Sequence, residues 1–224
     1  GLGEAIHRVI QMDDHFRMQP AALEAQLRAD QEQGLYPWLL VGSAGTTDAG
    51  AIDPLSTLGD IAYLNGLWFH VDGAYGGFFM LAPTGQERIQ GIAKADSLVM
   101  DPHKGLFLPY GIGAVLVKDG DQLYRSHYYT ANYMQDSLSA DEEVSPSEVS
   151  PELTKHFRGL RMWLSLQLFG VKLFRAALEE KIQLARYFYD LLREKPGYEV
   201  GLPPALSVVL FRYQPPEAWD TDAF

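Results

Sequence analysis

Two charged residues follow two separate apolar runs in this chain. Asp72 ends the run Leu67–Val71, and Lys104 comes shortly after the run Ser97–Met100. Such runs are typical of buried parallel strands, and ligands of open α/β sheets bind at the carboxyl ends of the strands. A carboxylate there can keep a pyridinium nitrogen protonated, and an amine there can form a Schiff base with an aldehyde. The pair therefore predicts a site for pyridoxal phosphate.

Each of these residues also has a plainer interpretation. An Asp before small residues is commonly a turn former, and a His-Lys pair such as His103-Lys104 is commonly solvated surface. The two apolar runs favour the shared site, because they would bring both charged groups to the same edge of one sheet.

Small residues surround Asp72 and also follow an earlier apolar run. Gly73 and Gly76 allow close approach of the backbone to a ligand, and Ala74 would place only a methyl group beneath a flat ring. The segment 42–47, with sequence GSAGTT, is a similar backbone-rich turn. Taken alone, this turn is better explained as an ordinary strand-to-helix connection, and it is not a nucleotide phosphate loop.

Three segments between residues 41 and 118 carry a specific resemblance. Their sequences are VGSAGTTDAGAIDP, WFHVDGAYGGFF and ADSLVMDPHKGLF. They resemble the group II pyridoxal-phosphate-dependent amino acid decarboxylases, the family of the aromatic-amino-acid, histidine and glutamate decarboxylases. Weaker similarity extends from about Asp13 to Arg212, through the segment FRGLRMWLSLQLFGV.

The resemblance implies a role for five residues. Lys104 would form the Schiff base with the cofactor, Asp72 would pair with the pyridinium nitrogen, and Ala74 would lie under the ring. His103 would lie near the cofactor phosphate, and Thr46 near the ring hydroxyl or the substrate carboxylate. No metal ligand is implied.

The resemblance also implies the fold and the domain organisation. We expect an α/β, fold-type I, transferase-like large domain, with a mostly parallel sheet flanked by helices. Residues 1–195 would form part of this cofactor-binding domain without its N-terminal portion, and residues 196–224 would begin a small C-terminal domain. Half of the pocket, including the group that stacks on the cofactor, would then lie outside this chain.

Hydrophobic periodicity and turn residues predict the elements that would position these groups. The helix predicted over 160–192 is expected to bend at Gly170. Its apolar side chains are expected to be buried in helix packing and dimerisation: Trp163, Leu164, Leu166, Leu168 and Phe169. The predicted elements are helices over 20–33, 54–65 and 160–192, strands over 38–43, 67–71, 97–100 and 208–211, a strand over 111–117 that is antiparallel or at an edge, a helix or loop over 86–92, and a loop over 137–151.

Composition narrows the classes of protein. The 224 residues are 47% hydrophobic and 21% charged, which is enough for one large domain with a sizeable core. The net charge of −11 disfavours nucleic acid and anionic membranes as partners. Because there is no cysteine, disulfides, thiol nucleophiles and zinc-cysteine sites are excluded. With neither a leader sequence nor an apolar run of about 20 residues, a cytoplasmic protein is expected.

Asp101 does not fit the cofactor site simply. It stands where several relatives carry Asn, and a carboxylate near a phosphate dianion costs Coulomb energy. We therefore expect Asp101 to point away, to cap a backbone donor or to pair with a cation.

The function expected from the resemblance is decarboxylation of an L-amino acid to its amine and carbon dioxide, in a homodimer with a shared active site. Alternatives are a related carbon–carbon lyase of the sphingosine-phosphate-lyase type, an oxidative aldehyde synthase and a catalytically silent cofactor-binding fragment. Aromatic, acidic and imidazole substrates all remain open.

A mobile-loop tyrosine that protonates the carbanion is general among decarboxylating relatives, and this chain departs from that pattern. No tyrosine occurs between Tyr133 and Tyr187. Either another group delivers the proton, with Tyr128, Tyr129, Tyr133 and His103 as candidates, or oxygen reacts instead and an aldehyde forms.

Overall fold

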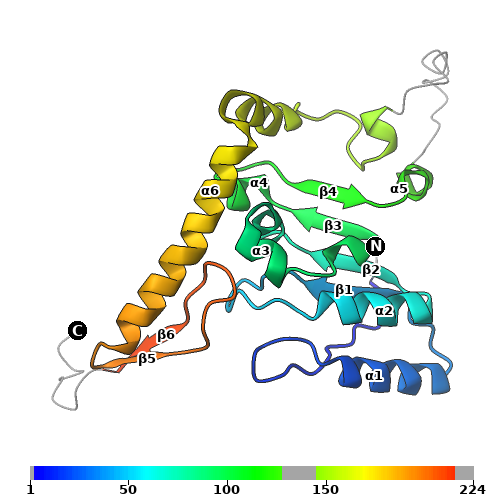
Figure 1. Cartoon of the computed structure of the whole chain (residues 1–224). Helices are drawn as coiled ribbons and strands as arrows, with labels where there is room; N and C mark the ends of the chain where they lie inside the picture. Colours follow the sequence, from blue (N-terminus) through cyan, green and yellow to red (C-terminus); the bar gives the residue numbers. More distant parts are fainter. Residues whose placement is uncertain (1–2, 128–144, 215–224) are drawn as a thin grey trace, which may run out of the picture.

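The computed structural model of this chain describes residues 3–127 and 145–214, in which helices and strands alternate (Figure 1). In chain order the elements are α1 (Pro20–Glu32), β1 (Leu39–Ser43), α2 (Leu55–Asn65), β2 (Trp68–Asp72), η1 (Gly77–Leu81), α3 (Pro83–Arg88), η2 (Ile92–Lys94), β3 (Ser97–Met100), α4 (Pro102–Gly105), β4 (Ala114–Val117), α5 (Gly120–His127), η4 (Pro146–Glu148), α6 (Gly159–Arg193), β5 (Tyr198–Val200) and β6 (Phe211–Tyr213).

The central sheet has four strands in the order β1-β2-β3-β4. The first three are parallel, and β4 is antiparallel to β3 at the edge of the sheet. In the register, Ser43 lies opposite Asp72, and Asp72 lies opposite Val99. The mostly parallel sheet and the antiparallel edge strand predicted from the sequence are therefore confirmed.

Local sequence signals explain where the helices begin and end. Pro20 occupies the first turn of α1, where its missing N–H costs no hydrogen bond. Gly66 ends α2 with φ +65°, a left-handed conformation that glycine adopts without strain, and its N–H caps the last turn. Leu55, Leu58 and Ile61 of α2 are buried, and α2 packs against β1 and β2.

The core gathers residues from distant parts of the sequence. Phe69 and Val71 alternate along β2 with the half-covered Trp68 and His70, so only one face of this strand is fully buried. Leu206, near the other end of the chain, is completely buried in the same cluster. The segment before β6 therefore contributes to the same hydrophobic core as the central sheet.

Helix α6 confirms the predicted span and break, but the apolar residues of its first half are not buried within the single chain. Gly170 has φ 70° and ψ 158°, and the half after it buries Phe174 and Leu178. In the half before it, Trp163 is 58% exposed and Phe169 61% exposed. Leu164 and Leu168 are also exposed, and Leu166 is partly buried, so these five are not buried within the single chain, and their burial by dimerisation stays a prediction. The helix bends at Gly170 (Figure 1), and Trp163, Leu168 and Phe169 in the first half remain more than half exposed, whereas Leu166 packs against the core.

The C-terminal strand begins later in the chain than the predicted range 208–211. Residues 208–210 are not in a strand, and β6 begins at Phe211 and pairs with β5. The reason is packing, because Val208 lies against the Gly50 backbone of the turn after β1. The predicted loop over 137–151 falls mostly outside the described residues, as do Tyr128, Tyr129 and Tyr133. None of the described helices is long and apolar enough to cross a membrane.

Candidate active site

Asp72 and Lys104 are brought together by the pairing of two parallel strands. Asp72 is the last residue of β2, and Lys104 lies in α4, the turn that follows β3. Backbone bonds tie the two strand ends: Gly73 N–H donates to Val99 O at 3.0 Å, and Asp101 N–H donates to Ala74 O at 3.1 Å. The carboxylate of Asp72 is also fixed, since its Oδ1 accepts a bond from Ala74 N–H at 3.0 Å.

Thr46 joins the same edge from β1. Ala44 N–H donates to Asp72 O at 2.8 Å, which extends the pairing of β1 with β2 into the next turn. Thr46 Oγ1 accepts a bond from Ala51 N–H at 3.1 Å, and this closes the turn 45–51. Gly45 needs its φ of +97°, and a Cβ there would lie 2.8 Å from Cδ1 of Tyr75. The glycine therefore lets the turn lie directly against the residue after Ala74.

These residues line one cleft of about 630 Å³. Four of the five predicted site residues contribute to its wall, namely Thr46, Asp72, Ala74 and Lys104. The remaining wall residues are Met12, Phe16, Ser43, Gly45, Thr47, Asp48, Ala49, Tyr75 and Leu210. The volume is typical of clefts that hold a small organic ligand.

His103 is not among the wall residues of this cleft. Its Nδ1 lies 2.6 Å from Ile112 O, and because a carbonyl only accepts, Nδ1 carries the proton. Its ring also packs on Tyr110, with the ring centroids 5.2 Å apart. The geometry places His103 beside the site and turned toward the loop before β4.

The amine of Lys104 has a carboxylate partner within its own turn. Nζ lies 2.9 Å from Oδ2 of Asp101, and the same oxygen lies 3.7 Å from Nε2 of His103. Of the three possibilities for Asp101, the described structure shows pairing with a cation. The carboxylate is mostly buried, whereas nearly half of the Lys104 side chain remains exposed in the cleft.

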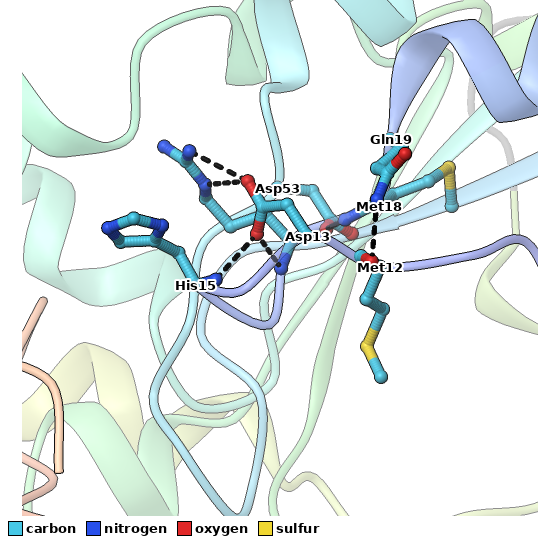
Figure 2. Close-up of polar contacts among 7 residues, drawn as sticks. Met12, Asp13, His15, Met18, Gln19 and Asp53 are labelled. Atoms are coloured by element: carbon cyan, nitrogen blue, oxygen red, sulfur yellow. Dashed lines mark hydrogen bonds and ion pairs between the residues drawn. The ribbon is translucent and has the colours of Figure 1, made fainter.

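Sequence reasoning missed the wall that comes from the N-terminal loop. Phe16 has φ 59°, which is unusual for a bulky residue and is tolerated only where the surroundings hold it. Asp13 supplies that hold (Figure 2): its Oδ1 accepts bonds from His15 N–H and Arg17 N–H, and its Oδ2 pairs with the Arg17 guanidinium. The Arg17 side chain is the main reason that the pKa of Asp13 is lowered to about 2.

Asp53 links this loop to β1 through two hydrogen bonds. Its Oδ1 accepts a bond from Met18 N–H at 2.7 Å, and its Oδ2 accepts one from Ser43 N–H at 2.8 Å (Figure 2 shows Asp53 and Met18). The sequence predicts Asp53 only as the start of a helix. The alternation of apolar and polar residues carries no signal for such a long-range side-chain contact.

The cleft fits pyridoxal phosphate by the chemistry of its donors. A fixed carboxylate, a primary amine, a hydroxyl and a small methyl converge on one space of suitable size. Larger side chains are kept out of the adjoining turn, because a Cβ at Gly76 would collide with the carbonyl oxygen of Ala44. These are the groups needed to hold a pyridinium, an aldehyde and a flat ring.

A family model described as the pyridoxal-dependent decarboxylase conserved domain matches residues 2–214. The chain belongs to this pyridoxal-dependent decarboxylase family. The resemblance found in the sequence, the fold-type I class and pyridoxal phosphate as the cofactor are thereby confirmed.

Individual relatives agree with the family assignment. An aromatic-L-amino-acid decarboxylase from Bacillus atrophaeus is 38% identical over 99% of this chain and 47% of that protein. A phenylacetaldehyde synthase from Arabidopsis thaliana is 33% identical over 93% of this chain and 43% of that protein. The crystal structure of Oryza sativa TDC with PLP and tryptamine superposes with a TM-score of 0.85 at 28% identity, over 92% of this chain and 43% of that one. The chain thus spans less than half the length of the relatives it matches.

Proposed function

We propose that the full-length protein decarboxylates an L-amino acid to its amine and carbon dioxide with pyridoxal phosphate. The observation that carries this proposal is the convergence of Asp72 and Lys104 on one cleft, at the ends of adjacent strands, in a chain of the decarboxylase family. Bound pyridoxal phosphate supplies the electron sink that takes up the electron pair released when carbon dioxide leaves.

Asp72 and Lys104 have distinct tasks in this proposal. Lys104, whose primary amine lines the cleft, would hold the aldehyde of the cofactor through Nζ. Asp72 would hold the proton on the ring nitrogen through a charge-assisted hydrogen bond, worth roughly 1.5–3 kcal/mol net. Its orientation is preset by Ala74 N–H, so no reorganisation is needed when the cofactor binds.

Three further residues shape the site. Ala74 would support one face of the ring, since its methyl leaves room where a larger side chain would collide. Thr46, in the turn after β1, would contact the ring hydroxyl or the substrate carboxylate. His103, which does not line the cleft and whose Nδ1 bonds to Ile112 O, would lie near the phosphate.

The assembly is also a proposal. We infer that the protein works as a cytoplasmic homodimer with a shared active site, and that residues 1–195 belong to the large domain and residues 196–224 to a small one. Support for the dimer comes from the apolar face on the first half of α6, where Trp163, Leu168 and Phe169 are more than half exposed. Support for the domain boundary comes from the separate two-stranded sheet of β5 and β6.

An oxidative aldehyde synthase is the second candidate. Two facts favour it: no tyrosine occurs between Tyr133 and Tyr187, and one relative is named a phenylacetaldehyde synthase. The decarboxylase is preferred, because the family model and the Bacillus relative both carry that name.

One experiment decides between these functions. The full-length protein is incubated in air with aromatic, acidic and imidazole L-amino acids, and carbon dioxide, amine, aldehyde, ammonia and peroxide are measured. Amine equal to carbon dioxide supports the decarboxylase. Aldehyde, ammonia and peroxide as main products would establish the synthase instead. If no substrate yields carbon dioxide although the cofactor is bound, the protein is a silent cofactor-binding subunit.

A further inference from the structure

The phenol of Tyr75 joins the cleft to Ser207, 132 residues further along the chain. Its oxygen lies 2.6 Å from Ser207 Oγ and accepts a bond from Ser207 N–H at 2.9 Å. Burial raises the pKa of Tyr75, so the hydroxyl keeps its proton and can donate it to Ser207 Oγ. One hydroxyl therefore makes two hydrogen bonds to the same distant residue, and the Tyr75 ring is held edge-on to Phe79.

Other contacts show how closely the segment 204–210 follows the cleft turns. Arg88 Nη1 donates to Pro204 O at 3.0 Å and also to Ala205 O. Leu206 is fully buried, and its Cδ1 lies 3.2 Å from where a Cβ of Gly45 would stand. The segment is thus packed against the turn that carries Thr46, with no room for a larger residue between them.

The two ends of this contact both belong to the cleft wall. Tyr75 follows Ala74 directly and lines the cleft, and Leu210 lines it from the other end of the segment 204–210. The segment continues at once into β6. Any displacement of the C-terminal part of the chain therefore reaches the cleft through Tyr75 and Leu210.

We propose that Tyr75 is a positioning residue, whose phenol locks the segment 204–210 against the cofactor cleft and so fixes the wall formed by Ala74, Tyr75 and Leu210. The lock is specific to the hydroxyl, because the ring packs on Phe79 whether or not the oxygen is present. This proposal rests on the cofactor site proposed above, but its first readout requires neither cofactor nor turnover.

The test uses full-length protein with Tyr75→Phe, Ser207→Ala and the double variant. Tyr75→Phe removes both hydrogen bonds and Ser207→Ala removes only the one between the two hydroxyls, while both variants keep the apolar packing. Tyr63→Phe serves as control, since Tyr63 on α2 is 86% exposed. Hydrogen exchange of peptides covering 204–210 is measured without cofactor, and the rate of pyridoxal phosphate release on dilution is measured afterwards by absorbance.

We expect Tyr75→Phe to speed exchange in 204–210 by about tenfold, equivalent to about 1.4 kcal/mol of lost local stability, and to speed cofactor release in parallel. Ser207→Ala should have a smaller effect, and the double variant should match Tyr75→Phe, because Tyr75→Phe already removes the bond that Ser207→Ala removes. Additive effects, or unchanged exchange in 204–210, would overturn the lock. Faster exchange with unchanged cofactor release would show a purely structural contact and would also overturn it. In each case covalent attachment at Lys104 is retained, so the proposed function is judged separately.

Discussion

Asp101 and Lys104 form an ion pair across a single turn, with Oδ2 of Asp101 2.9 Å from Nζ of Lys104. The pair stands at the start of α4, where the backbone of Asp101 also donates to Ala74 O. Asp101 therefore contacts both the residue proposed to bind the cofactor covalently and the residue proposed to support its ring. The amine must leave this carboxylate before it can attack an aldehyde.

We predict that Asp101→Asn speeds covalent attachment of pyridoxal phosphate, because Lys104 no longer has an anionic partner to leave. Stability should change by less than about 1 kcal/mol, since nearly half of the lysine side chain is solvent-exposed and such pairs contribute little. Stopped-flow absorbance of full-length protein mixed with cofactor measures the rate. Slower attachment in the variant would mean that Asp101 orients the amine productively.

Lys104→Ala should abolish covalent attachment and lower turnover by ~10³-fold or more, because the cofactor loses its anchoring amine. Borohydride reduction followed by peptide mass analysis locates the attachment. Lys172→Ala, on the exposed face of α6, is the matched control and should behave as wild type. Label recovered on another lysine of the Lys104 variant would remove Lys104 from the proposed role.

Asp72→Asn should preserve the fold and lower turnover by on the order of 10²–10³-fold. The fold survives because an amide oxygen can still accept the bond from Ala74 N–H, so the free energy of unfolding should fall by less than about 1 kcal/mol. Turnover falls because an amide cannot stabilise a proton on the ring nitrogen. Thermal melting and steady-state rates of full-length protein check both parts, and near-wild-type rates would exclude Asp72 from the mechanism.

The strand ends and the residues on them could be predicted from the sequence, because buried runs and the charged residues after them are local features. Asp72 and Lys104 are examples, and the register of β2 on β3 brings them together as expected. Phe16, Asp53 and Leu210 could not be found in this way. Their places depend on side-chain bonds and packing between segments far apart in sequence, which no periodicity encodes. Trp163 and Phe169 are exposed within the single chain for a related reason, since an apolar stripe predicts contact but not the element that supplies it.

The N-terminal loop around Asp13, which carries Phe16 into the cleft wall, predicts a selective effect on substrate binding. Asp13→Asn breaks the ion pair with Arg17 that holds the loop around Phe16, so Phe16 should lose its fixed place in the cleft wall. We expect KM to rise several-fold with kcat changed much less, as for the loss of a uniform binding contact. Asp14→Asn, at the exposed neighbouring position, is the control. A fall in kcat with unchanged KM would show that the loop acts on chemistry instead of binding.

His70 predicts how stability depends on pH. Burial lowers the pKa of His70 from its usual 6.5, and the nearby Asp72 only partly opposes this. The hydrogen bonds agree with a neutral ring: Trp68 Nε1–H donates to Ser97 Oγ, which leaves the Ser97 hydroxyl proton free for Nδ1 of His70 at 2.7 Å. Between the folded and the unfolded pKa the unfolded chain binds more protons, so this group's contribution to stability is present above about pH 6.5 and is lost as pH falls below it. Urea unfolding of full-length protein at a series of pH values should therefore show a loss of stability in this range.

His70→Asn keeps an acceptor for Ser97 but cannot be protonated, and should remove that part of the slope. His156→Asn, at an exposed position, should retain the wild-type slope, and an unchanged slope in the His70 variant would assign the effect to other groups.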